Sequence, residues 1–280
     1  MRDRKELLRS TSLFVFDFDE TLAATSEASP NGLNVVKAYA LALDEIFGVA
    51  GLLEAVGGLQ NRAPSQLIQE VLREDASLAE HAKNYYAYQQ ERLSGLVLPG
   101  KGVDMDSALT RGDELGFCAE LLVREKLALL HKEQGEGPSG IWPAPCKGAA
   151  AFLQTLGDQK WGIISSGHEM FIAATLRLWE LSYPALSVTD DDLRGLSLPV
   201  EAKSKPSPYL FDVLLGQAAS QGLLITRDRI LFIGDDPDKD GGLAQNAGVN
   251  FLWYNQHGRP SREGMAEFRH WNELTAEYCG

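Results

Sequence analysis

Five short apolar runs, each followed by a polar or turn-forming cluster, constrain the fold of this chain more than any other feature. Such runs, rich in β-branched and aromatic residues, predict buried parallel strands. Helical patterns lie between the later runs, so the order predicts right-handed βαβ units and an α/β fold class: a doubly wound, mainly parallel sheet. The runs occupy residues 13–16, 161–164, 185–188, 230–233 and 249–254.

Residues 30–140 interrupt this alternation. They carry several helical stripes, for example over 35–47, and no convincing strand. Turn-rich segments flank them, with Ser29-Pro30-Asn31-Gly32 on one side and 135–145 on the other. We therefore predict an inserted all-helical domain at 30–140 within a core domain made of 1–29 and 141–280.

Composition excludes several classes of partner. The chain has 280 residues and a formal net charge of −13, without the clusters of Lys and Arg that a nucleic-acid surface needs. No apolar run approaches the roughly 20 residues that span a bilayer, and the first residues lack the apolar stretch of a signal peptide. Three widely spaced cysteines suggest reduced thiols. We expect a cytoplasmic protein that binds neither nucleic acid nor membrane; its oligomeric state is not evident.

A pair of carboxylates follows the first run directly. Asp17 and Asp19, at i and i+2, fall where that strand should end. Ligands of open α/β sheets bind outside the carboxyl ends of the strands. One carboxylate can attack a phosphoryl group while its neighbour shuttles a proton. Taken alone, the pair is equally compatible with an acidic turn after a core strand.

Three further motifs follow in order. Ser165 ends the run 161–164, Lys205 opens Lys205-Pro206-Ser207-Pro208, and Gly234-Asp235 continues to Asp240 after 230–233. Together with Asp17-Phe18-Asp19-Glu20-Thr21, this order resembles the haloacid dehalogenase-like (HAD) hydrolases, of the phosphatase type with a C1 helical cap. The resemblance implies a Rossmann-like HAD core and a cap at 30–140.

The resemblance also implies catalytic roles. Asp17 would attack phosphorus and become an aspartyl phosphate, and Asp19 would act as general acid and then general base. Ser165 and Lys205 would bind the phosphoryl group and offset its charge; Lys203 is a competing candidate. Dehalogenases of the family generally lack the second aspartate, so Asp19 favours phosphate chemistry.

The carboxylates predict a metal site. Two charges about 4 Å apart repel by about 4 kcal/mol at an effective dielectric of 20, and a hard dication removes that conflict. Oxygen ligands suit Mg²⁺. We expect Asp17, Asp235 and either Asp236 or Asp240 as carboxylate ligands, and the resemblance adds the backbone carbonyl of Asp19.

Substrate contacts are predicted at two places. Ser166 and Gly167 adjoin Ser165, and the segment Gly57-Gly58-Leu59-Gln60-Asn61-Arg62 resembles the specificity loop of the cap. Arg62 would then hold an anionic part of the substrate, although a plain surface arginine fits the pattern as well.

The expected function is a Mg²⁺-dependent phosphatase that hydrolyses a small phosphomonoester, so the expected partner is a small phosphorylated metabolite. A phosphomutase would keep the same motifs. A catalytically idle HAD-like binding protein is the alternative of another class, which the intact motifs disfavour.

Overall fold

The computed structural model describes residues 4–59, 62–137, 140–157 and 160–280 and divides into two compact units. The core unit contains Met1–Thr25, Pro143–Asp190 and Ser197–Gly280, and the inserted unit contains Ser26–Trp142 and Asp191–Leu196. The main junctions fall within a few residues of the predicted ones. Residues 191–196 differ: the sequence analysis assigns them to the core, whereas they group with the inserted unit.

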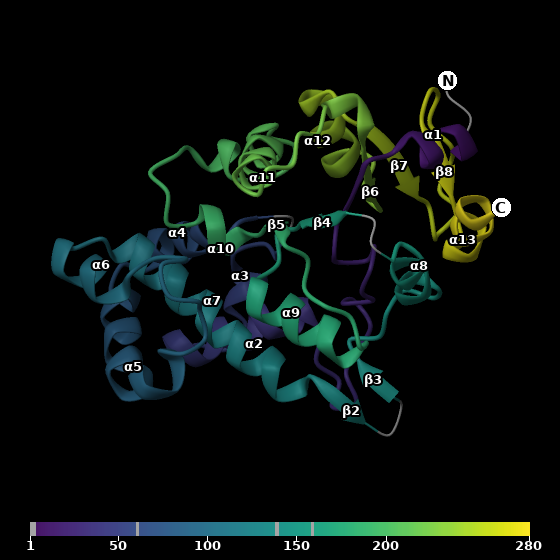
Figure 1. Cartoon of the computed structure of the whole chain (residues 1–280). Helices are drawn as coiled ribbons and strands as arrows, with labels where there is room; N and C mark the ends of the chain where they lie inside the picture. The colour runs from purple at the N-terminus through teal and green to yellow at the C-terminus, as the bar shows by residue number, and fades with distance from the viewer. Residues whose placement is uncertain (1–3, 60–61, 138–139, 158–159) are drawn as a thin grey trace. The chain divides into compact units, whose positions relative to one another are not determined.

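The core unit is built on one parallel sheet with the strand order β5-β4-β1-β6-β7-β8 (Figure 1). This sheet confirms the predicted doubly wound α/β fold, with β1 between β4 and β6. The edge strand β8 was not predicted. The strands are β1 Leu13–Phe16, β4 Trp161–Ile164, β5 Leu186–Val188, β6 Ile230–Gly234, β7 Asn250–Tyr254 and β8 Ala266–Phe268.

Helices cover both faces of this sheet, which is why β1 and β6 are apolar throughout and fully buried. On one face of the sheet Phe14 packs edge-on against Phe152, with the ring centroids 6.1 Å apart. On the other face Phe232 packs edge-on against Phe211, with the centroids 5.5 Å apart. The helices are α1 Arg4–Ser10, α8 Ala149–Thr155, α9 Glu169–Leu178, α11 Tyr209–Ser220, α12 Lys239–Ala247 and α13 Trp271–Cys279, and the short α10 Asp190–Leu193 spans the junction with the inserted unit.

The inserted unit is helical apart from one short ribbon. Strand β2 Gly135–Gly137 pairs antiparallel with β3 Gly140–Trp142, so the expectation of an all-helical insertion is wrong at this point. Three-residue strands in a glycine-rich stretch show no periodicity that a sequence pattern can reveal. The helices are α2 Val35–Phe47, α3 Leu52–Ala55, α4 Pro64–Glu74, α5 Leu78–Leu93, α6 Met105–Arg111 and α7 Glu114–Glu133.

Ion pairs around a buried glutamate explain why residues 191–196 belong to the inserted unit. The carboxylate of Glu120 on α7 is fully buried and accepts hydrogen bonds from Arg194 Nε at 2.8 Å and Arg124 Nε at 2.9 Å. Arg194 also pairs with Asp191 at 3.0 Å. A buried charge is tolerated only when it is paired in this way, so the pairs tie the segment to α7. Across the described ranges, no helix is long and apolar enough to cross a membrane.

Candidate active site

Three carboxylates converge at the carboxyl end of the core sheet, two of them at the ends of neighbouring strands and the third at the start of a helix. Asp17 follows β1 and Asp235 follows β6, and the backbone N–H of Asp17 donates to Ile233 O at 2.9 Å. Asp240, in the first turn of α12, completes the group. Each of the three offers one oxygen, and these oxygens all lie within 4.8 Å of one another. The parallel pairing of β1 with β6 therefore produces the cluster that the motif order predicted.

Lys205 lies inside this cluster. Its Nζ is 2.5 Å from Asp17 Oδ1 and 2.7 Å from Asp240 Oδ1, and its side chain is only 6% exposed. Burial alone would lower the pKa of Lys205, but the two carboxylates outweigh burial and raise the pKa above its ordinary value. Lys205 is thus a fixed cation that can offset negative charge at Asp17.

One lysine does not neutralise three carboxylates, of which Asp17 and Asp240 are buried and Asp235 is half-buried. Burial, reinforced by the charges of Asp17 and Asp240, raises the pKa of Asp235 to about 8. Burial likewise raises the pKa of Asp240 to about 6 and raises that of Asp17, with Lys205 opposing both shifts. An all-oxygen donor set with excess negative charge fits Mg²⁺. The residues present therefore suit a divalent cation at Asp17, Asp235 and Asp240.

The turn after β1 is organised by two threonines. The hydroxyl of Thr21 lies 3.4 Å from Asp17 Oδ2 and 3.4 Å from Asp235 Oδ1, and Thr25 donates to Asp19 Oδ1 at 2.7 Å. Glu20, which directly precedes Thr21, has a φ of 56°, so the chain turns sharply here. Sequence reasoning gave neither threonine a role. Thr21 ends the DxDxT motif and could have been noticed, whereas nothing in the sequence marks Thr25.

The turn after β4 adjoins Asp19. Ser165 Oγ accepts a hydrogen bond from Gly167 N at 2.9 Å. A methyl group placed on Gly167 would lie 3.1 Å from Ser165 Oγ and 3.5 Å from Asp19 Oδ2, so the turn and the carboxylate are in close contact. Ser166 is exposed on the same turn. The structure thus brings Ser165 and Gly167 to the edge that carries Asp19.

The sequence does not decide whether Asp236 or Asp240 is the third metal carboxylate, and the two residues differ in their surroundings. Asp236 Oδ1 accepts from the backbone N–H of Asp238 at 2.9 Å and of Lys239 at 3.0 Å, which caps the start of α12. Asp240 instead turns toward Lys205 and packs against Gly234, where an added Cβ would lie 2.2 Å from Asp240 Oδ2. Asp240 is therefore the better candidate for the third carboxylate of the cluster.

Arg62 belongs to the inserted unit, where its guanidinium is turned toward the preceding loop. Its Nη2 donates to Val56 O at 2.5 Å and also contacts Gly58 O. Arg62 thus braces the turn at Gly57 and Gly58, both of which have positive φ. Gln60 and Asn61 of the predicted specificity loop lie outside the described residues.

The raised carboxyl pKa values predict that the protein without divalent cations loses stability as pH rises from 5 to 8. Below pH 4 both the folded and the unfolded state hold the proton of Asp235, and between pH 4 and 8 only the folded state does. Raising pH through this window should therefore lower the free energy of unfolding by about 2–4 kcal/mol and lower Tm by about 5–10 °C.

Calorimetry of the protein in EDTA, across this pH range, measures the effect. Asp235→Asn should flatten the slope, and an equal slope in that variant would contradict the assignment.

Comparison with known proteins agrees with this geometry. A family model described as HAD-hydrolase-like matches residues 203–276, which include Lys205, Asp235 and Asp240. The chain is 32% identical over 126 residues to the pyrimidine 5'-nucleotidase YjjG of Escherichia coli K12; the match covers 44% of this chain and half the length of that relative.

A solved structure of a HAD hydrolase, family IA, variant 3, from Entamoeba histolytica superposes with a TM-score of 0.51 at 15% identity, over 96% of this chain and 97% of that one. This likeness concerns the fold, and the matched family model covers the strand end that carries the carboxylates. Residues 203–276 are thus similar to the haloacid dehalogenase-like (HAD) hydrolases, and the chain has the fold of a solved member of that group.

Proposed function

We propose that the protein is a Mg²⁺-dependent phosphatase that hydrolyses a small phosphomonoester through an aspartyl phosphate on Asp17. The observation that carries this proposal is the placement of Asp17, which contacts Lys205 at 2.5 Å within a group of three carboxylates. A nucleophilic carboxylate, a buried cation and a set of oxygen ligands are what phosphoryl transfer requires.

The residues divide the reaction into two steps. Asp17 Oδ attacks phosphorus while the bond from phosphorus to the leaving oxygen breaks, and Asp19 gives that oxygen a proton. Asp19 then takes a proton from a water molecule that attacks the aspartyl phosphate, which releases inorganic phosphate and restores Asp17. The hydrogen bond from Thr25 holds the carboxylate of Asp19 in place. Ser165 and Lys205 stabilise the charge on the phosphoryl oxygens.

The metal would be held by Asp17, Asp235, the backbone carbonyl of Asp19, and Asp240 directly or through water. When bound, Mg²⁺ supplies positive charge that lets the carboxylates and the phosphate coexist. Asp236 is proposed as a helix cap that positions Asp240, because its carboxylate accepts two backbone N–H groups at the start of α12.

We further propose that the inserted unit is a cap that selects the substrate and excludes water. It begins at Ser26, directly after Thr25, so the chain enters it from the turn that holds Asp19. Closing segments of this kind act on the non-reacting part of a substrate. The YjjG relative is a pyrimidine 5'-nucleotidase, so nucleoside monophosphates belong among the first substrates to test.

A panel of phosphorylated metabolites tests the function. Purified protein with Mg²⁺ should release inorganic phosphate from some members of the panel. Isomerisation of a sugar phosphate without phosphate release would instead indicate a phosphomutase. Binding of phosphorylated ligands with neither reaction would indicate a catalytically idle protein.

We also propose, as the sequence predicts, that Arg62 contacts an anionic part of the substrate, and this role gives a separate prediction. Arg62→Ala should raise KM for the best panel substrate by about tenfold, because it removes a charged contact worth roughly 1–2 kcal/mol. Activity toward 4-nitrophenyl phosphate, whose aryl group is uncharged, should fall much less. Arg73→Ala is the matched control, since Arg73 pairs with Glu70 on the exposed side of α4. Equal losses on both substrates would mean that Arg62 only braces Val56 and Gly58.

A further inference from the structure

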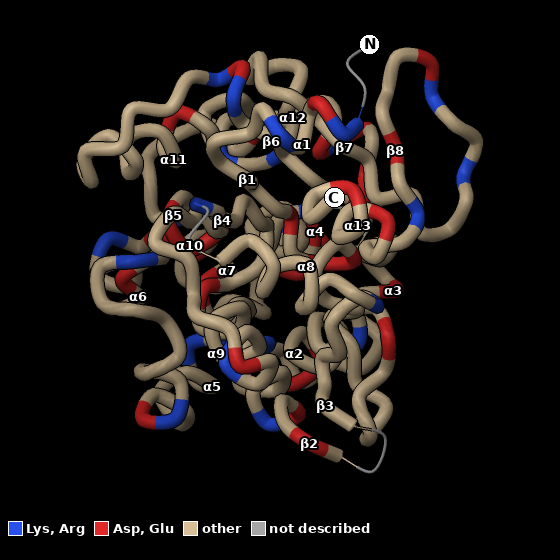
Figure 2. The backbone as a smooth tube through the Cα atoms, turned by 45° about the vertical axis from the view of Figure 1, so that its right-hand side comes forward, with Lys and Arg blue, Asp and Glu red and all other residues tan. Residues whose placement is uncertain are grey.

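Acidic residues are spread along much of the chain. There are 39 of them against 26 basic residues, and Figure 2 shows Asp and Glu positions on many elements of both units. An exposed acidic side chain is solvated and mobile, whereas the ligands of a metal site are oriented by partners behind them. The groups that hold Asp235 in place therefore bear directly on its proposed role as a ligand.

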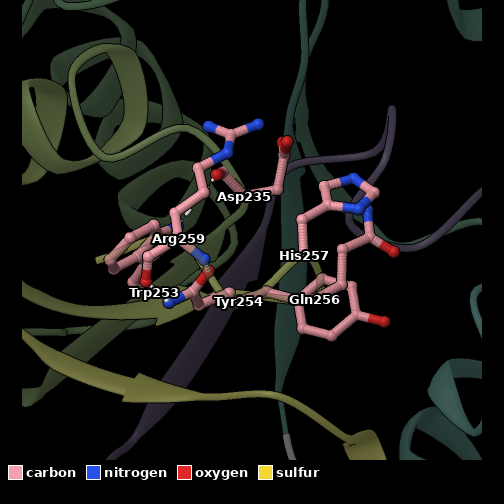
Figure 3. Close-up of a pocket in the computed structure, with 7 residues that line it drawn as sticks. Asp235, Trp253, Tyr254, Gln256, His257 and Arg259 are labelled. Atoms are coloured by element: carbon pink, nitrogen blue, oxygen red, sulfur yellow. Dashed lines mark hydrogen bonds between the residues drawn. The ribbon is translucent and has the colours of Figure 1, made fainter. Parts of the chain in front are cut away.

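A buried tryptophan on β7 contacts the backbone of Asp235. Trp253 is 1% exposed, and its Nε1 donates a hydrogen bond to Asp235 O at 2.9 Å. Figure 3 shows the two residues beside each other in the wall of a small hollow where β7 ends. Because an indole ring has a single donor and this ring is buried, the direction of the hydrogen bond is set by the packing of β7.

The hydrogen bond falls where the pairing of β6 with β7 ends. β6 stops at Gly234, which lies opposite Trp253 in the parallel register, so Asp235 is the first residue beyond the strand. A backbone carbonyl taken out of water needs a donor, and beyond the end of a strand a side chain can supply it. The strand holds Asp235 from its amino side, and Trp253 holds it from its carbonyl side. With both sides held, the backbone sets the direction of the carboxylate.

The carboxylate of Asp235 depends on its backbone more than the other two carboxylates do. Lys205 Nζ lies 2.5 Å from Asp17 Oδ1 and 2.7 Å from Asp240 Oδ1, so a buried cation holds both of these side chains directly. The hydroxyl of Thr21 lies 3.4 Å from Asp235 Oδ1, which is longer than the roughly 2.5–3.0 Å of a good O–H···O hydrogen bond. The backbone, and hence Trp253, therefore contributes more to holding Asp235.

We propose that Trp253 is a positioning residue of the metal site, whose indole N–H holds Asp235 in the orientation that binds Mg²⁺. This inference rests on the proposed Mg²⁺-dependent function and extends its site to a residue that acts through a ligand. A partner of this kind raises the affinity for metal, because the ligand does not have to be ordered when the metal binds. Such partners are typically worth about 10- to 100-fold in metal affinity.

Trp253→Phe tests the proposal, because it removes the donor and keeps an aromatic ring. The dependence of Tm on Mg²⁺ concentration gives the Kd of Mg²⁺ for the EDTA-treated protein without any substrate. We expect the substitution to raise this Kd by about tenfold or more. Phosphate release gives a second readout. The Mg²⁺ concentration for half-maximal activity should rise by a similar factor, while kcat at saturating Mg²⁺ should stay within about twofold of wild type.

Trp142→Phe is the matched control. Trp142 is 4% exposed, and its Nε1 donates to Glu27 O at 3.1 Å within the inserted unit, which does not contain the carboxylate cluster. The control therefore loses the same ring and the same kind of hydrogen bond, and its Kd for Mg²⁺ should be that of the wild type. Neither substitution changes a charge, so weak binding of Mg²⁺ to exposed acidic groups is the same in both variants.

An isostere separates the hydrogen bond from the packing of the ring. Site-specific replacement of Trp253 by benzothienylalanine puts a sulfur atom in place of the N–H and keeps the bicyclic ring. It should raise the Kd of Mg²⁺ as Trp253→Phe does. Because its shape matches that of tryptophan, it also provides the test if the smaller phenyl ring prevents folding.

The outcomes separate this inference from the function on which it rests. Wild-type Mg²⁺ affinity in the isostere overturns the inference and leaves the phosphatase proposal standing. A Kd that Trp142→Phe raises as much as Trp253→Phe does overturns it as well, because the loss then reflects a general loosening of the protein. Neither Mg²⁺ binding nor Mg²⁺-dependent phosphate release in the wild type would overturn both proposals.

Discussion

Asp17→Asn should abolish phosphatase turnover, with kcat reduced by about four to six orders of magnitude, as when a nucleophile is removed from other hydrolases. An amide does not form the aspartyl phosphate, because its nitrogen and oxygen lack the charge of a carboxylate. The fold should persist, since asparagine matches the shape of aspartate and Lys205 keeps its 2.7 Å contact with Asp240. Phosphate release and the covalent phosphoenzyme trapped by acid quench both measure the effect.

The control for this variant is Asp238→Asn. Asp238 is exposed and pairs with Arg262, and surface pairs contribute little to stability. Its activity should stay near that of the wild type. If Asp17→Asn kept activity within tenfold, with its Tm unchanged, Asp17 would not be the nucleophile, and the acid quench of Asp19→Asn would decide whether Asp19 takes that place.

The central strands could be predicted because their signal is local. In β1, β4 and β6 each run is apolar along its length and ends in polar residues, since both faces of the sheet are covered. Strand β8 is different. Its three residues include Glu267, and it is a strand only because it pairs with β7. Such pairing depends on tertiary context, which a sequence pattern does not contain.

In the candidate site, too, some features follow from local sequence patterns and others depend on the tertiary structure. The convergence of Asp17 with Asp235 follows from strand order, because the carboxyl ends of neighbouring parallel strands meet at one edge. The choice between Asp236 and Asp240 depends on where α12 begins, since Asp236 accepts hydrogen bonds from the backbone N–H groups at the start of the helix and Asp240, in its first turn, contacts Lys205.

The segment 191–196 shows most clearly which features cannot be predicted from the sequence. Its place in the inserted unit depends on the ion pair of Arg194 with Glu120, two residues far apart in the sequence. Each residue alone looks like an exposed charge on a helix or loop. Only the fold shows that Glu120 is fully buried and that Arg194 satisfies it.

Removal of divalent cations should reduce activity by about a thousandfold or more, and Mg²⁺ should restore it. The metal contributes several kcal/mol to charge stabilisation, and each 1.36 kcal/mol of barrier is tenfold in rate. Ca²⁺ should restore little activity, because it expands its coordination and lengthens its bonds to oxygen. The measurement is phosphate release after dialysis against EDTA, followed by titration with each cation.

The stability of the protein provides a readout of the same site that does not depend on turnover. Mg²⁺ at a hundred times its Kd should stabilise the folded state by about 2.7 kcal/mol. Asp235→Asn should weaken this stabilisation more than Asp240→Asn does, because Asp235 is fixed at the end of β6, whereas Asp240 already pairs with Lys205 at 2.7 Å. Asp238→Asn, three residues from Asp235, should leave it unchanged. Full activity after chelation, or equal Mg²⁺ stabilisation in all three variants, would place the metal elsewhere or remove it from the mechanism.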